Sequence, residues 1–98
     1  GDSSGEMVRD LATSYISHGR HTAAIELIQR LVTEREAEVS PYNLALTFET
    51  MSRAYWEMND PAAAKAAIQE GLRRFPSGWQ AVQLRRTLER YEAATAGL

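Results

Sequence analysis

Apolar side chains recur along this chain at spacings of three and four residues, and four breaks at glycine or proline interrupt the recurrence. This period places the apolar side chains on one side of a helix. The breaks fall at Gly19, Pro41, Pro61 and the segment 76–78. Glycine can take the left-handed backbone that ends a helix, and proline suits the first helical position. With no strand alternation and no Asn-Gly or Asp-Gly turn, the sequence predicts an all-α fold of five helices.

The residues at these breaks also carry side chains that cap helices. Ser40 and Asp60 precede the two prolines, and each is expected to be an N-cap. Ser77, with Gln80 three residues later, resembles a capping box. Each expected helix has its own apolar face. The first helix has Val8, Leu11, Ala12, Tyr15 and Ile16, and the second has Ala24, Ile25, Ile28, Leu31 and Val32. The third has Leu44, Phe48, Met51, Tyr55 and Met58, the fourth has Ile68, Leu72 and Phe75 among alanines, and the fifth has Trp79, Val82, Leu88 and Tyr91.

The two halves of the chain share one pattern. When Tyr15 is placed on Tyr55, the pairs are Val8 with Phe48, Leu11 with Met51, Ala12 with Ser52, Ala24 with Ala64, and Ile28 with Ile68. Two helices of a hairpin approach closely only where side chains are small, and large side chains fill the gaps on either side. The pattern therefore predicts two similar hairpins that stack, because one hairpin alone cannot bury its apolar face.

The second copy of the pattern consists of Phe48, Met51-Ser52, Tyr55, Ala64, Ile68, Gly71 and Pro76. It resembles the tetratricopeptide repeat, whose outline is W-x₂-L-G-x₂-Y, then A-x₃-F, then P. Residues 8–32 match less well, because Leu31 replaces a small residue and Glu36 replaces the final proline. The resemblance covers about 90 residues if the fifth helix is a closing cap. It implies a right-handed stack of two antiparallel helical hairpins with a C-terminal capping helix.

These patterns divide the chain into five segments. Residues 1–5 are expected to be a linker or a cloning scar, 6–38 the first hairpin, 41–75 the second hairpin, 78–94 the capping helix and 95–98 a tail. Such ends are typical of a domain taken from a larger protein.

The spacing between the copies exceeds that of the family. The two tyrosines lie forty residues apart, whereas the family period is 34. The six additional residues fall between about Thr33 and Pro41. The second helix is therefore predicted to run on by one or two turns, and an acidic tip at Glu34, Glu36 and Glu38 is predicted to project.

The resemblance also implies a partner-binding groove lined by the first helix of each hairpin and by the fifth helix. Carried over by spacing, the groove residues are Arg9, Thr13, Ile16, Glu49, Thr50, Arg53, Trp56, Glu57, Gln83, Thr87 and Arg90, with Asp10, Leu46, Gln80 and Leu84 beside them. Of the adjacent residues Tyr55 and Trp56, only one can point into the hairpin core. Trp56 is thus expected either to line the groove near Arg53 or to pack on the fifth helix.

Some members of the family hold a partner's terminal carboxylate with a clamp of lysines and asparagines. The matching positions here are Arg9, Thr13, Thr50, Gln80 and Leu84, and only Arg9 is charged. The sequence therefore argues against a carboxylate clamp.

The function expected from this pattern is a protein–protein interaction module that binds a peptide or a helix of a partner. The alternative is a homodimerisation or scaffolding domain that associates through its end helices, with Val82, Leu84, Leu88 and Tyr91 as candidates. The alanine- and arginine-rich composition is typical of bacterial proteins. The compartment stays open, with the cytoplasm slightly favoured.

Other classes of function lack support in the sequence. No phosphate-binding loop, zinc-protease motif or nucleophile elbow occurs, so neither an enzyme nor a cofactor is expected. His18 and His21 flank the turn at Gly19, so no metal site is expected. The net charge of −2 argues against nucleic acid as a partner. No run of about eighteen apolar residues is present, so no membrane span is expected.

Overall fold

The computed structural model describes residues 3–97, which contain helices and no strand. The elements are α1 (Ser3–Ser17), α2 (His21–Arg35), the 3₁₀ turn η1 (Glu36–Glu38), α3 (Pro41–Glu57), α4 (Pro61–Arg74) and α5 (Gly78–Thr95). This confirms the predicted all-α class. Residues 3–5 were expected to be part of a linker, but they are helical; residues 1–2 lie outside the described part. Gly5 is buried, because its missing Cβ leaves room for Val39.

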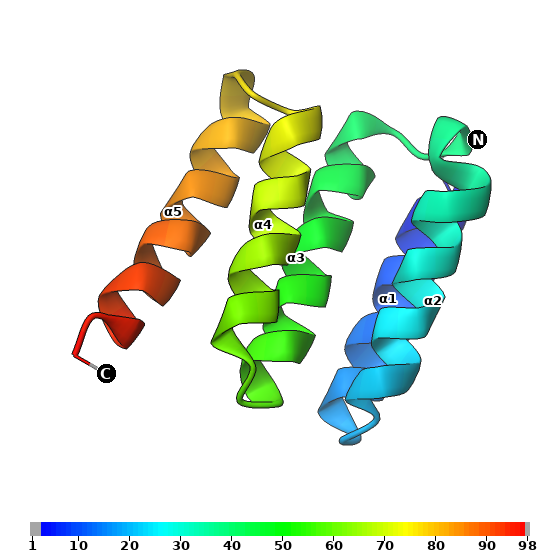
Figure 1. Ribbon diagram of the computed structural model, residues 1–98. Helices are drawn as coiled ribbons and strands as arrows, with labels where there is room; N and C mark the ends of the chain where they lie inside the picture. Colours follow the sequence, from blue (N-terminus) through cyan, green and yellow to red (C-terminus); the bar gives the residue numbers. More distant parts are fainter. Residues whose placement is uncertain (1–2, 98) are drawn as a thin grey trace.

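The helices form two antiparallel hairpins and a fifth helix in a row (Figure 1). α1 pairs with α2 and α3 pairs with α4, and α5 packs on both α4 and α3. α1 and α2 also pack on α3, so the second hairpin lies between the first hairpin and α5. The two ends of the chain lie at opposite ends of the row (Figure 1). The molecule measures 43 × 33 × 18 Å, and its smallest dimension fits two layers of helices about 10 Å wide.

Two of the three predicted caps are present. The Asn43 N–H donates to Ser40 Oγ at 3.2 Å, and the Ala63 N–H donates to Asp60 Oδ1 at 3.1 Å. The predicted capping box at Ser77 is wrong, since its side chain makes no capping bond. The reason is Gly78, whose φ of +86° departs from helical geometry at the first residue of α5.

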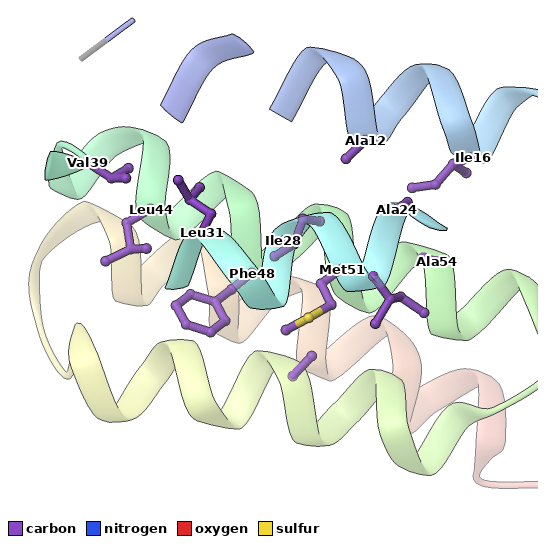
Figure 2. Close-up of a cluster of buried hydrophobic side chains, with 12 residues drawn as sticks. Ala12, Ile16, Ala24, Ile28, Leu31, Val39, Leu44, Phe48, Met51 and Ala54 are labelled. Atoms are coloured by element: carbon purple, nitrogen blue, oxygen red, sulfur yellow. The ribbon is translucent and has the colours of Figure 1, made fainter. Parts of the chain in front are cut away.

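The main core lies where the first hairpin meets α3 (Figure 2). Its buried members are Ala12 and Ile16 of α1, Ala24, Ile25, Ile28 and Leu31 of α2, Val39, Leu44, Phe48, Met51 and Ala54 around α3, and Ala67 of α4. Nearly all of these residues belong to the predicted apolar faces. Burying each large aliphatic or aromatic side chain contributes about 1.5–3 kcal/mol, so this contact holds the two hairpins together.

Four side chains expected on the apolar faces are exposed instead: Leu11, Met58, Trp79 and Val82. α5 turns a different side to the stack, because Ala81, Leu84 and Thr87 are its buried residues. The small Ala81 allows the closer approach, whereas Trp79 and Val82 lie outside this packed face and remain about half exposed.

A close approach of α3, α4 and α5 occurs at Gly71. A Cβ there would lie 3.1 Å from Leu84 Cδ1 and 3.2 Å from Phe48 Cβ. Ser52 is fully buried nearby on α3. The small residues that the repeat pattern places at these two positions therefore let three helices meet at one point.

The segment between the hairpins differs from its prediction. α2 ends at Arg35, and the chain continues as η1 and then buries Val39. Of the predicted acidic tip, Glu36 is half-buried and pairs with Arg74 of α4, whereas Glu34 and Glu38 are exposed and Glu38 pairs with Arg35 of its own segment. The additional residues are thus held to the stack by the buried Val39 and by the ion pair of Glu36. The pairing with Glu36 raises the pKa of Arg74, and that with Arg35 lowers the pKa of Glu38.

Candidate partner-binding groove

Three cross-contacts join α3 to α5 along their length. At one end the rings of Tyr42 and Trp79 lie 5.3 Å apart. In the middle, Thr87 Oγ1 donates to Glu49 Oε1 at 3.0 Å. At the other end, Tyr91 contacts α3. Residue numbers rise together on the two helices, so α3 and α5 run parallel and form one continuous surface.

A groove of about 640 Å³ opens over this surface, and α1 forms its second side. Its lining comprises Arg9 of α1, Leu46, Glu49, Thr50, Arg53 and Trp56 of α3, and Thr87, Arg90, Tyr91 and Ala94 of α5. These helices are the first of each hairpin and the fifth, which are the elements that the family resemblance assigns to a groove.

Trp56 satisfies both alternatives that the sequence left open. It stacks on Tyr91 with ring centroids 4.5 Å apart and planes 14° from parallel, and it also lines the groove. The Tyr91 hydroxyl lies 3.1 Å from the hydroxyl of buried Ser52. This polar contact fixes the ring of Tyr91, so the stacked pair forms a rigid aromatic wall.

The carboxylate of Glu49, which lies in the groove lining, accepts hydrogen bonds from neighbouring side chains of α5. Besides the bond from Thr87, Gln83 Nε2 lies 3.5 Å from both carboxylate oxygens of Glu49. Arg90 donates to the hydroxyl of Thr87 at 3.2 Å. α5 therefore supplies hydrogen bonds that hold the Glu49 carboxylate against its own side of the groove.

Glu57 lies just outside the groove and connects the two hairpins. Arg53 Nε donates to Glu57 Oε2 at 2.7 Å, and His21 Nε2 lies 3.1 Å from Glu57 Oε1. The hydrogen bond from Arg53, with a smaller effect of His21, holds the pKa of the Glu57 carboxyl below its ordinary value of 4.5. The pair orients the guanidinium of Arg53 at the edge of the groove.

The structure gathers seven of the eleven expected groove residues in the lining: Arg9, Glu49, Thr50, Arg53, Trp56, Thr87 and Arg90. The other four lie elsewhere. Ile16 is only 3% exposed, so its expected place in the groove is wrong; it packs in the core beside Ala24. Thr13 bonds back to the carbonyl of Arg9 at 2.9 Å. Glu57 and Gln83 are exposed beside the groove.

Sequence reasoning assigned two lining residues differently. The apolar spacing assigns Tyr91 to the packing face of the fifth helix, and the family resemblance does not include Ala94 among the groove residues. Both follow the spacing of groove residues already named, because Tyr91 comes four positions after Thr87 and Ala94 four positions after Arg90. Leu84, which spacing placed beside the groove, is fully buried against Gly71.

Two further findings concern the chemistry of the surface. Within residues 3–97, no group of three or more side chains of the metal-binding types lies close enough to hold an ion. Across the same residues, no helix has the length and apolar character that a membrane crossing requires.

Comparison with known proteins agrees with the geometry of the second hairpin. Residues 50–85 match the family model described as tetratricopeptide repeat. Neither a curated protein nor a solved structure gives a significant match to the chain. The matched span covers the second half of α3, all of α4 and the first part of α5, which are the helices that meet at Gly71. The chain therefore contains a tetratricopeptide repeat.

Proposed function

We propose that this chain is a protein–protein interaction module that binds a peptide or a helix of its partner in the groove between α1, α3 and α5. The tetratricopeptide repeat supports an interaction role in general. The observation that carries the specific proposal is the groove itself, which combines the Trp56–Tyr91 stack with arginine side chains from all three helices.

The composition of the groove suits recognition of a protein segment. Tryptophan, tyrosine and arginine are the residues most enriched among those that dominate binding energy at protein interfaces. The stacked pair offers a flat apolar surface, and Arg53 stands one turn before Trp56 on the same helix. A peptide or a single helix fits a groove of this size better than a globular surface does.

The test is affinity capture of binding proteins from source cells with the wild type and with an Arg53→Ala, Trp56→Ala double variant. Captured proteins are then purified and titrated against both forms by calorimetry. Loss of binding in the double variant, with unchanged helix content by circular dichroism, supports the groove. A Trp79→Ala variant is the matched control, because Trp79 is an exposed tryptophan outside the groove lining. Equal affinity of the double variant and the wild type would exclude the proposed site.

A second candidate function, homodimerisation through an end helix, is favoured by one observation on α1. The repeat alignment pairs Met7 with Thr47 and Leu11 with Met51. Met7 and Leu11 are 68% and 44% exposed, whereas Thr47 and Met51 are 0% and 8% exposed, where the first hairpin packs on α3. α1 thus exposes the face that a preceding helical pair covers in α3.

Sedimentation equilibrium tests this second candidate. A dimer that a Leu11→Glu variant converts to monomer supports it, and a wild type that stays monomeric at high concentration excludes it.

A further inference from the structure

We infer that the segment bound in the groove is acidic and carries an apolar side chain among its acidic residues. This inference rests on the proposed function and specifies the class of partner.

The first argument is the balance of charge in the groove lining. The lining holds Arg9, Arg53 and Arg90 and one carboxylate, that of Glu49, a net charge of +2; Glu57 beside the groove pairs with Arg53, which lowers the local balance to +1. The whole chain carries −2. The groove is therefore a local positive region on a protein that is otherwise weakly acidic, and such a region attracts and orients a negatively charged partner.

The second argument is the hydrogen bonding of these groups. Glu49 already accepts a bond from Thr87 and is in reach of Gln83, so its charge is partly compensated within the fold. Arg90 donates to the neutral hydroxyl of Thr87. Each guanidinium has five N–H donors, and this bond uses only one of the five on Arg90. The groove thus offers arginine donors to a ligand while its one carboxylate is engaged.

A comparison with other arginines of the molecule strengthens this point. Arg73 and Arg74 on α4 pair with Glu70, and Arg74 also pairs with Glu36. Across residues 3–97, no carboxylate forms a salt bridge to Arg9 or to Arg90. The fold therefore leaves these two guanidinium groups, on opposite sides of the groove, without the carboxylate partners that α4 provides for its own arginines.

The third argument concerns the apolar requirement. The Trp56–Tyr91 stack, Leu46 and Ala94 form the apolar part of the lining. A purely polyacidic segment would leave this surface in water, whereas an apolar side chain beside the acidic ones would cover it. The pattern expected in the ligand is therefore an apolar residue with acidic residues on both sides, which place carboxylates toward α1 and α5.

The experiment selects ligands without assuming a partner. A displayed library of random peptides is panned on the wild-type protein, and each selected peptide is titrated by fluorescence anisotropy. The groove variant is Arg9→Gln, Arg90→Gln. The control is Arg30→Gln, Arg86→Gln, which changes the net charge equally; its two arginines are exposed and lie on α2 and on α5 outside the groove lining.

The expected result is a set of peptides with net negative charge around an apolar residue. Their affinity should fall about tenfold in the groove variant, stay unchanged in the control, and weaken as salt is added. Exchange of their acidic residues for glutamine should give a similar loss.

Two outcomes overturn the inference, and only the second also overturns the groove as the binding site. Neutral or basic peptides that lose binding in the Arg53→Ala, Trp56→Ala variant would contradict the acidic partner and leave the groove as the binding site. Selected peptides that bind that variant and the wild type equally would contradict the groove as well.

Discussion

Gly71 provides the sharpest test of how the second hairpin is packed. An alanine there would place its Cβ 3.1 Å from Leu84 Cδ1 and 3.2 Å from Phe48 Cβ. Ordinary contact between carbon atoms begins at about 3.5 Å. Phe48 Cβ is bonded directly to the backbone of α3 and cannot retreat without moving that helix, and Leu84 is fully buried, so its Cδ1 has little free space into which to rotate.

Two opposing free energies set the outcome of Gly71→Ala. Alanine gains about 1 kcal/mol over glycine inside a helix. Overpacking of a close contact costs about 1–3 kcal/mol, and the contact with Phe48 Cβ, next to the backbone of a packed helix, places this site near the middle of that range. The free energy of unfolding is therefore expected to fall by about 1 kcal/mol.

Urea unfolding followed by circular dichroism measures this change. With a slope of about 1 kcal/mol per molar for a small domain, the midpoint should fall by about 1 M. Ala66→Gly, at an exposed position of α4, serves as the control for helix propensity alone and should also cost about 1 kcal/mol. A Gly71→Ala midpoint at or above that of the wild type would refute the argument that close packing requires glycine.

Three other predictions concern caps, the core and pH. Asp60→Ala should lower the free energy of unfolding by about 1 kcal/mol, because α4 loses its N-cap bond. Ser77→Ala should change the free energy of unfolding by less than about 0.5 kcal/mol, because the Ser77 side chain makes no capping bond. Urea unfolding of the two variants compares these effects. Phe48→Ala should cost about 3–5 kcal/mol, since a fully buried ring leaves a cavity, and calorimetry would show a correspondingly lower melting temperature. Hydrogen bonds from arginines hold the folded-state pKa values of Glu57 and Glu70 below 4.5, so their contribution to stability is present above about pH 4.5 and is lost as pH falls through the folded pKa. Melting temperatures measured across this range should drop less in a Glu57→Gln, Glu70→Gln variant than in the wild type, and an equal drop would show that other groups cause the loss.

The helices and their order follow from local signals in the sequence. The prolines after Ser40 and Asp60 mark helix starts that depend only on neighbouring residues, and both caps form as predicted. The small residues Ser52 and Gly71 likewise predict a close contact, because any hairpin with this pattern requires one. The cap rules involve atoms only a few residues apart, and among the three predicted caps they fail only at Ser77, where Gly78 has a left-handed backbone.

What the sequence predicted poorly depends on neighbours distant in the chain. The apolar spacing of α5 fits two adjoining faces, and only packing against Gly71 selects the face with Ala81 and Leu84 over the one with Val82. The acidic segment after α2 has the composition of a solvated tip, yet Arg74, thirty-eight residues away, pairs with Glu36.

Most of the groove was predicted because the family resemblance implies which helices line it, and helix spacing then places residues on one side of each helix. Thr13, Glu57 and Gln83 lie outside the lining, and Ile16 departs furthest from its expected place. Its side chain is buried in the main core with residues of α2 and α3. The stack of Trp56 on Tyr91 could not be foreseen, because it depends on how far α5 slides along α3. Spacing within one helix carries no information about that offset.

The arrangement of the helices in a row also has consequences for how the molecule folds. Its main contacts join elements that are neighbours or next neighbours in the chain, a low contact order that favours rapid folding. The groove, however, draws its walls from three successive units, so it is complete only when the last unit has docked. Fraying of α1 or α5 at either end of the row removes one wall. A ligand that contacts all three helices would therefore couple the two ends of the chain, and its binding free energy would be added to the stability of each.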